Sequence, residues 1–265
     1  MALNDTYIFS FEKEWDYPSF HKYMKEHWTD SIIYSAVYLI VIFGGQMYMQ
    51  KRKRFDLRPA LALWSSVLAI FSIVGSFRVL PELIRSVRDH SWEYSMCVGS
   101  YYEDPVAGFW AFLFTLSKVI ELGDTVFIVL RKQELIFLHW YHHITVLLYV
   151  WYSYPERIAS GRWYIAMNFL VHSLMYTYYT LRAMKFNIPK QFNILITSLQ
   201  LLQMVIGISI NIFTYNVLNS ARNCQQTYIN VKVCFLMYFS YFVLFINFFY
   251  TNYIEKPKKG HNKQQ

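Results

Sequence analysis

Residues 107–130 read AGFWAFLFTLSKVIELGDTVFIVL, an apolar run in which Lys118, Glu121 and Asp124 are the only charged residues. About 20 mostly apolar residues are enough to cross the ~30 Å hydrocarbon core of a bilayer. The segment must then be helical, because backbone polar groups in lipid have to be satisfied within it. The stretch therefore predicts a membrane-spanning helix, and its steps of three place the three ionisable side chains on one face.

Similar apolar runs recur along the chain. We expect seven transmembrane helices, over about 31–50, 60–80, 107–130, 135–153, 162–183, 193–215 and 231–253. The composition agrees, because 55% of the 265 residues are apolar and only 16% are charged, whereas a soluble domain has about 25% charged residues. The predicted fold class is an all-α polytopic membrane protein. Residues 31–253 would form its catalytic domain, between an N-terminal segment (1–30) and a basic tail (254–265).

The net charge of +8 does not form a basic face, so we exclude nucleic acid as a partner. The Lys and Arg residues lie instead in short clusters between apolar runs, above all in the loop 51–59. Cytosolic loops of membrane proteins carry such clusters. The charge distribution therefore predicts a lumenal N-terminus and a cytosolic C-terminus.

Two features of the expected lumenal side fit this orientation. Asn4 begins the glycosylation sequon Asn4-Asp5-Thr6, for which a chance tripeptide is the alternative. Cys97 and Cys224 both fall in lumenal loops, where an oxidising compartment favours a disulfide between them. Two free thiols are the alternative.

Four of the expected helices carry polar side chains, which are costly in a membrane and mark a functional site by default. They are Lys118, Glu121 and Asp124; His139, His142 and His143; Asn168, His172, Tyr176 and Tyr179; and Thr197, Gln200 and Gln203. At about 1.5 Å per helical residue, these sets converge in the half of the membrane nearer the cytosol. The sequence therefore predicts one buried polar site that opens to the cytosol.

Structural roles stay open for part of this set. For Lys118 and Glu121 the alternative is a structural ion pair. For the two glutamines it is hydrogen bonding between helices, and for the two tyrosines it is packing.

The residue types in this polar set limit the reactions that the site can catalyse. Imidazoles are common metal ligands, so one alternative is a metal-dependent membrane lipid oxidase or desaturase, with Glu121 and Asp124 completing its site. No cysteine and no Gly-x-Ser-x-Gly motif lies in the set, which disfavours a thiol or serine nucleophile. Imidazole can itself be a nucleophile that forms an acyl intermediate. A receptor would not need this set, and a transporter would show internal repeats and broken helices, which we do not find.

Four motifs on successive spans together resemble the very-long-chain fatty acid elongases, which are 3-oxoacyl-CoA synthases. They are KVIELGDT (118–125), HWYHH (139–143), NFLVHSLMYTYY (168–179) and TSLQLLQ (197–203). The run RKQELIFLHWYHH (131–143) is similar to the branch that acts on saturated and monounsaturated acyl chains of about palmitoyl length. The resemblance covers essentially the whole chain.

This resemblance implies a multi-pass enzyme of the endoplasmic reticulum membrane, with six of seven helices forming a barrel around a substrate tunnel. The implied reaction condenses a long-chain acyl-CoA with malonyl-CoA to give 3-oxoacyl-CoA, CO2 and CoA. Both CoA esters are substrates, and no metal or other cofactor is implied. Membrane lipid surrounds the protein, and the reductases and dehydratase of the elongation cycle are implied as further partners.

Combined with physical chemistry, the resemblance assigns roles to the four histidines. We expect His142 to be the nucleophile that takes the acyl group as an acyl-imidazole. His139, His143 and His172 would transfer protons or stabilise the developing oxyanion. Asn168, one turn from His172, would orient that ring or donate to a thioester oxygen.

The remaining polar residues are expected to support this chemistry. Lys118, Glu121 and Asp124 would form a charge network that holds the histidines in the needed protonation state. The substrate-binding candidates are Gln200, Gln203, Tyr176 and Tyr179 within the membrane, and Arg131, Lys132 and Lys185 on the cytosolic side. For the basic residues, ordinary positive-inside charge is the alternative role. An apolar tunnel would bind the acyl chain, because each buried methylene contributes about 0.8 kcal/mol.

Overall fold

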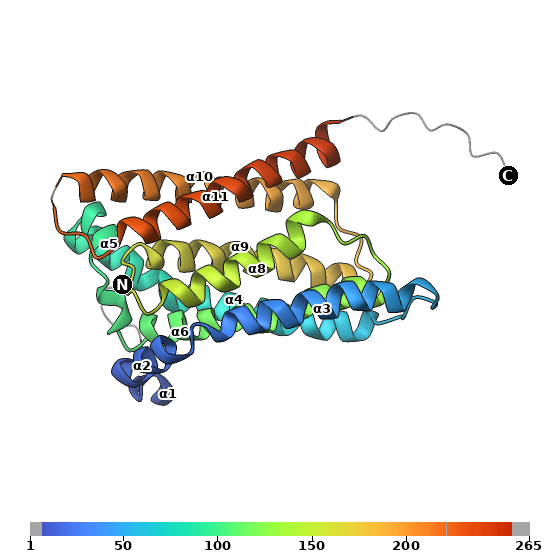
Figure 1. Cartoon of the computed structure of the whole chain (residues 1–265), viewed down its shortest axis with the longest axis horizontal. Coiled ribbons are helices and arrows are strands. Elements are labelled where there is room, and N and C mark those ends of the chain that lie inside the picture. The colour runs from blue at the N-terminus through green and yellow to red at the C-terminus, as the bar shows by residue number, and fades with distance from the viewer. Residues whose placement is uncertain (1–6, 221, 256–265) are drawn as a thin grey trace.

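Helices make up the regular structure of residues 7–220 and 222–255, which are the residues that the computed structural model describes (Figure 1). The long helices are α3 (Asp30–Gln50), α4 (Arg58–Arg85), α6 (Ala107–Glu121), α7 (Gly123–Leu130), α8 (Phe137–Ser153), α9 (Gly161–Ala183), α10 (Lys190–Asn219) and α11 (Tyr228–Phe249). The short elements are α1 (Ser10–Lys13), α2 (Tyr17–His27), η1 (Ser86–His90), α5 (Trp92–Cys97), η2 (Ser100–Tyr102) and η3 (Tyr250–Ile254).

Six helices close a ring. Going round it, α4 contacts α9, α9 contacts α10, α10 contacts α11, α11 contacts α8, α8 contacts α6, and α6 returns to α4. Helix α3 lies outside this ring, against α7 and α8. The structure therefore contains the expected barrel of six helices and identifies the first long helix as the one outside it.

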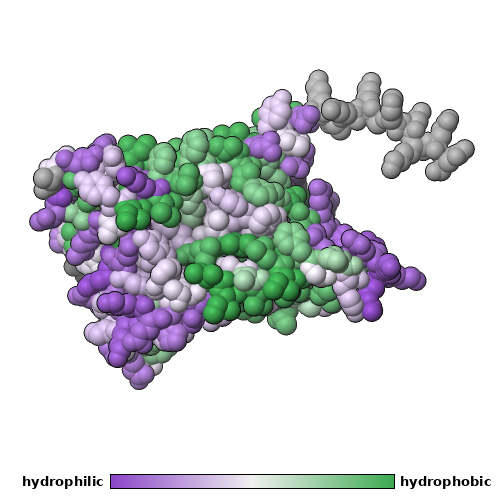
Figure 2. Space-filling model, viewed as in Figure 1, coloured by the Kyte–Doolittle hydropathy of each residue, from purple (hydrophilic) through white to green (hydrophobic). Residues whose placement is uncertain are grey.

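The outer surface of the barrel suits a bilayer. Apolar residues gather over the middle of the molecule and polar residues at its two ends (Figure 2). On α3, for example, Ile33, Val37 and Ile40 are exposed. Among the described residues, α3, α4 with η1, α10, and α11 with η3 are each long and apolar enough to cross a membrane. The fold is thus an all-α polytopic membrane protein, as predicted.

The other expected spans differ in detail from the sequence prediction. The span 107–130 is interrupted at Leu122, so that α6 and α7 are separate helices. Helix α8 has only 17 residues, and α9 carries Asn168 and His172. Helices α6, α7 and α8 have 15, 8 and 17 residues and are too short to be found as spans by themselves, whereas α9 has 23 residues but is not apolar enough because of its polar side chains.

The two ends of the barrel are built differently. At one end, which we call the disulfide end, a disulfide between Cys97 and Cys224 joins the end of α5 to the α10–α11 connection. Helices α1, α2 and α5 gather there (Figure 1). At the opposite end, the Arg131 end, the amide of Phe55 donates to the carbonyl of Leu130 and ties the α3–α4 loop to α7.

Two sequence predictions fall outside the described residues. The sequon residue Asn4 lies in the first six residues, and the expected basic tail is described only as far as Glu255.

Close packing of α4 against α9 sets one wall of the interior. A Cβ atom at Gly75 would lie 2.5 Å from the ring of Phe169. Only a glycine at this position lets the ring approach the backbone of α4 so closely. Phe169 is buried beneath that backbone, and its neighbour Asn168 lines the barrel cavity described next.

Candidate active site

A cavity of about 730 Å³, which we call the chamber, occupies the half of the barrel nearer the Arg131 end. All six ring helices contribute to its wall. Most of the polar residues singled out in the sequence line it, namely Glu121, Asp124, Arg131, His139, His142, His143, Asn168, His172, Tyr176, Tyr179, Lys185, Thr197, Gln200 and Gln203. Lys118 and Lys132 do not line it.

Lys118 lies behind the chamber wall, where it is 2% exposed. Its ammonium donates to Oε1 of Glu121 at 2.7 Å and to Oδ1 of Asn168 at 3.0 Å, and it lies 4.1 Å from the ring centre of Phe114. Asn168 continues the chain of contacts, because its Nδ2 is 3.2 Å from Nε2 of His172. The other nitrogen of His172 is 3.8 Å from Oε2 of Glu121. A buried cation thus links α6 to the imidazole of α9.

Asp124 anchors a second set of contacts. Its Oδ1 accepts a hydrogen bond from Nε1 of Trp64 at 2.6 Å, and its Oδ2 accepts one from the hydroxyl of Tyr176 at 2.7 Å. Both carboxylate oxygens are therefore occupied by donors from α4 and α9. Through these two hydrogen bonds Asp124 joins α7 to α4 and α9 at the chamber wall.

The histidines of α8 have unequal surroundings. Nε2 of His139 is 3.0 Å from the hydroxyl of Thr125, which is itself 2.6 Å from the hydroxyl of Tyr38 on α3. The ring centre of His143 lies 4.5 Å from that of His139. His139 is thus held by a hydrogen bond that reaches back to α3.

His142 is held differently. Nδ1 of its ring is buried with no hydrogen-bond partner among the described residues, while the side chain lines the chamber. The ring packs against Tyr241 of α11, with 4.6 Å between ring centres. Nε2 is therefore the nitrogen that can meet a ligand in the chamber.

The remaining predicted polar residues of α9 and α10 also lie around the chamber. Nε2 of Gln200 is 3.5 Å from the sulfur of Met175, and Gln203 is buried in the chamber wall. Tyr179 is 44% exposed, whereas Tyr176 is buried. The hydroxyl of Thr197 donates to the carbonyl of Asn193. The structure therefore brings all the predicted sets from α6 to α10 to one cavity.

Four basic side chains line the Arg131 end of the chamber: Arg58, Arg131, Arg182 and Lys185. They come from the start of α4, the end of α7, the end of α9 and the turn that follows α9. The side chain of Lys132 points away from the chamber, because its ammonium donates to the carbonyls of Gln50 and Arg52, at and just beyond the end of α3. It ties two loops together, and the mouth of the chamber is formed without it.

Sequence reasoning missed two residues that line this cavity and two that contact its lining residues from behind. Arg58 and Arg182 are not among the predicted site residues, although their position next to an expected span was a usable signal. Trp64 and Tyr241 contact the lining residues Asp124 and His142 and lie on other helices than the four motifs. Nothing in their local sequence distinguishes them from the chain's other aromatic residues, which make up 20% of it.

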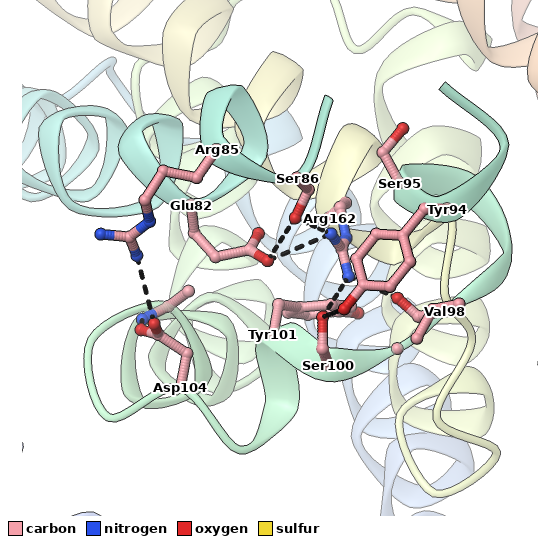
Figure 3. A network of polar contacts seen from close by, with 12 residues as sticks. Glu82, Arg85, Ser86, Tyr94, Ser95, Val98, Ser100, Tyr101, Asp104 and Arg162 are labelled. Atoms are coloured by element: carbon pink, nitrogen blue, oxygen red, sulfur yellow. Dashed lines mark hydrogen bonds and ion pairs between the residues drawn. The ribbon is translucent and has the colours of Figure 1, made fainter. Parts of the chain in front are cut away.

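A separate polar network lies at the disulfide end (Figure 3). Arg162 of α9 is 3% exposed; it pairs with Glu82 at 3.1 Å and donates to Ser86, Ser100 and the carbonyl of Val98. It thus connects α9 to α4 and to the segment that follows α5. A smaller cavity of about 270 Å³ adjoins it. This network holds the disulfide end of the barrel together, and none of its residues is among the predicted site residues.

The carboxylates near the α8 histidines are committed to other partners. Glu121 accepts from Lys118 and Ser117, and Asp124 from Trp64 and Tyr176. Within residues 7–220 and 222–255, no group of three or more His, Cys, Asp or Glu residues is arranged to hold a metal ion. The chamber is therefore a polar cavity whose carboxylates are hydrogen-bonded, and the imidazoles of His142 and His143 lie in its wall without hydrogen-bond partners among the described residues.

Fold and site together define a class of protein: a polytopic membrane protein whose helical barrel encloses a histidine-lined chamber with a basic mouth. The ELO (GNS1/SUR4) family model matches residues 23–261, and this chain belongs to that family.

Relatives from several animals match over nearly the whole chain. "Very long chain fatty acid elongase 6" of Drosophila melanogaster is 52% identical over 254 residues, covering 95% of this chain and 80% of the relative. "Putative fatty acid elongase 3" of Caenorhabditis elegans is 49% identical over 258 residues, covering 97% and 80%. "Very long chain fatty acid elongase 6" of Homo sapiens is 45% identical over 251 residues, covering 95% and 94%.

Proposed function

We propose that this protein is an acyltransferase that condenses a long-chain acyl-CoA with malonyl-CoA, giving 3-oxoacyl-CoA, CO2 and CoA. One observation carries the proposal: a single chamber inside a membrane barrel has four basic side chains at its mouth and four histidines at its wall. The relatives' names, which are those of fatty acid elongases, support it.

The basic mouth suits the CoA end of both substrates. Arginine presents a planar fork of donors that matches phosphate oxygens, and lysine acts on phosphate as a point charge. Arg58, Arg131, Arg182 and Lys185 would hold the CoA phosphates at the Arg131 end. The thioester would then reach inward to the histidines, and the acyl chain would enter the apolar barrel. The charged mouth, together with a chamber wall that carries both imidazoles and apolar side chains such as Phe127 and Phe245, supports a long-chain acyl-CoA as the substrate class.

In the reaction, Nε2 of His142 attacks the acyl thioester. The carbon–nitrogen bond forms, the carbon–sulfur bond breaks, and CoA leaves as a thiolate that takes up a proton from water, while Nδ1 of His142 keeps its own proton until the neutral imidazole is released. Malonyl-CoA then loses CO2, and the resulting enolate attacks the acyl-imidazole. The new carbon–carbon bond forms, the carbon–nitrogen bond breaks, and His142 is released. The acyl-histidine splits one difficult substitution into two easier steps.

Contacts around the imidazoles support this division of roles. The rings of His139 and His172 are engaged by Thr125 and Asn168, whereas the ring of His142 makes no hydrogen bond within the described residues and lines the chamber. His143 also lines the chamber and is the alternative acyl acceptor. Lys118, acting through Asn168 and Glu121, would keep His172 oriented so that it can move protons.

The proposed reaction needs no resident cofactor, because decarboxylation itself supplies the electron pair for the new carbon–carbon bond. We place the protein in the endoplasmic reticulum membrane, with the disulfide end and the N-terminus in the lumen and the Arg131 end facing the cytosol. An oxidising lumen suits the Cys97–Cys224 disulfide. The 3-oxo product requires reductases and a dehydratase to complete the cycle, and these are the expected partners.

The test uses the full chain, purified in detergent and given palmitoyl-CoA and malonyl-CoA, with products measured by mass spectrometry. We expect 3-oxostearoyl-CoA without added metal or NADPH, and no product when malonyl-CoA is omitted. If folded protein yields no 3-oxoacyl-CoA from any saturated or monounsaturated acyl-CoA, the proposal is wrong.

A further inference from the structure

The proposed nucleophile lacks the usual means of orientation. A functional imidazole is normally aimed by a hydrogen bond from its second nitrogen to a carboxylate, a carbonyl or water. For His142, Nδ1 is buried and has no such partner within the described residues. Because no hydrogen bond sets the ring's direction, packing has to set it.

That packing comes from α11, a helix that contributes none of the four motifs. Tyr241 is 2% exposed, and its ring lies 4.6 Å from the ring of His142 at an interplanar angle of 56°. Among the described residues, the other aromatic neighbour of His142 is His143, at 5.9 Å between ring centres, which lies on the same helix and moves with it. Tyr241 is therefore the ring that holds His142 from across a helix–helix interface.

Tyr241 is itself fixed by hydrogen bonds. Its hydroxyl is 2.6 Å from the hydroxyl of Thr145 and donates to the carbonyl of His142 at 3.3 Å. Thr145 in turn donates to the carbonyl of Tyr141 at 2.7 Å. The tyrosine is thus tied at its hydroxyl to the turn of α8 that carries His142, while its ring faces the imidazole.

Resting on the function proposed above, we propose that Tyr241 is a positioning residue that sets the direction of the His142 imidazole and so determines the rate of acyl transfer. It acts through His142 and does not line the chamber. A misplacement of about 1 Å at a reacting group can cost on the order of 100-fold in rate, so loss of the ring should be visible in kcat.

The same helix offers a matched control. Tyr238 lies one turn from Tyr241, is 5% exposed, and packs against Gly207 and Tyr164. Tyr238→Leu removes the same atoms from the same helix, but from its packing against α9 and α10, and so does not touch His142. A general weakening of the barrel would affect both Tyr241→Leu and Tyr238→Leu, whereas a change in the direction of the His142 ring would affect only Tyr241→Leu.

The experiment compares Tyr241→Leu, Tyr241→Phe, Thr145→Val and Tyr238→Leu by kcat, by KM for palmitoyl-CoA and by the single-turnover rate of acyl-enzyme formation. We expect Tyr241→Leu to lower kcat and the acylation rate at least about tenfold with KM within about twofold. Tyr241→Phe should recover most of the loss, Thr145→Val should show a smaller loss, and Tyr238→Leu should stay within about twofold of the original protein. If Tyr241→Leu acylates at the original rate, or falls no further than Tyr238→Leu, the inference is wrong.

A second readout needs no turnover and so separates this inference from the proposed function. Diethyl pyrocarbonate acylates accessible neutral imidazole, and mass spectrometry reports the ratio of modification at His142 to that at His139. We expect this ratio to change more than about twofold in Tyr241→Leu and to stay constant in Tyr238→Leu. An unchanged ratio in both variants contradicts the positioning role, even if no condensation is observed. If Tyr241→Leu fails to fold, the same readout and the same expected change apply to Tyr241→Met, which also removes the ring.

Discussion

Single residues in the barrel interior show how a membrane protein tolerates ionisable groups. The ammonium of Lys118 is surrounded by a carboxylate, an amide oxygen and an aromatic ring. Such a buried charge is stable only when it is paired, and removing one partner leaves the other charge uncompensated. The Lys118–Glu121 contact that the sequence left open as a structural ion pair is therefore present, and through Asn168 it also reaches the chamber.

This arrangement predicts the effect of Lys118→Met. The variant should lose about 3–5 kcal/mol of unfolding free energy, because the carboxylate of Glu121 would stay buried without its cation. Thermal unfolding in detergent measures the loss. The double variant Lys118→Met/Glu121→Gln removes both charges and should recover part of the stability. Unfolding of Lys118→Met at the original temperature would contradict the prediction.

Covalent capture distinguishes the two free histidines of α8. Protein incubated with palmitoyl-CoA alone should carry a palmitoyl group, and the modified peptide should contain His142. His142→Ala should abolish the adduct, whereas His143→Ala should retain it at a reduced rate. An adduct formed at the original rate by His142→Ala would move the nucleophile to another residue.

Elements at the disulfide end depend on a contact between distant parts of the chain. Glu12 of α1 is fully buried. It pairs with Arg78 of α4 at 2.5 Å and accepts from Nε1 of Trp110 at 2.8 Å. The short helix α1 has only four residues and would not form alone, because helix nucleation is unfavourable. Its position is therefore set by this buried carboxylate.

Glu12→Gln should consequently loosen the N-terminal segment. We expect a loss of about 3 kcal/mol in unfolding free energy, since the guanidinium of Arg78 would lose its buried counter-charge. The matched control is Glu93→Gln, which breaks the exposed pair with Arg222 and should cost at most about 1 kcal/mol. Limited proteolysis should cut the first 30 residues faster in Glu12→Gln only. Equal stability of the two variants would show that α1 is held by packing alone.

The whole molecule assembles the mouth of the chamber from three separate connections. Arg58, Arg131 and the neighbouring pair Arg182 and Lys185 come from three separate parts of the chain but line one opening. Charges at such a mouth bind phosphate in a salt-dependent manner, and their effect on a CoA ester should appear in binding.

Arg182→Gln should raise KM for palmitoyl-CoA several-fold while leaving kcat within about twofold, because the lost contact is with CoA and not with the reacting atoms. The effect should shrink as the ionic strength rises. Arg54→Gln is the matched control, since it removes an exposed charge from a loop at the same end outside the chamber wall. An equal change in KM for both variants would mean that only the net charge matters.

The sequence by itself determined the class of protein, the approximate spans and most of the polar residues of the chamber. These are local properties: an apolar run of sufficient length has to be a helix in lipid, and a polar residue within it has to face the interior. A step of three or four residues then places His139, His142 and His143, or Lys118 and Glu121, on one helix face. For that reason the four motifs could be expected to converge before any helix was placed.

Only the tertiary structure decided which helix lies outside the ring, which further residues complete the site and which predicted residue lies outside it. Trp64, Arg182 and Tyr241 reach the site because α4, α9 and α11 are packed at particular rotations and depths, whereas Lys132 is drawn to the carbonyls of Gln50 and Arg52. Rotation and depth are set by the fit of side chains between helices, such as Phe169 against Gly75. That fit depends on residues distant in the chain, and no local pattern in the sequence encodes it.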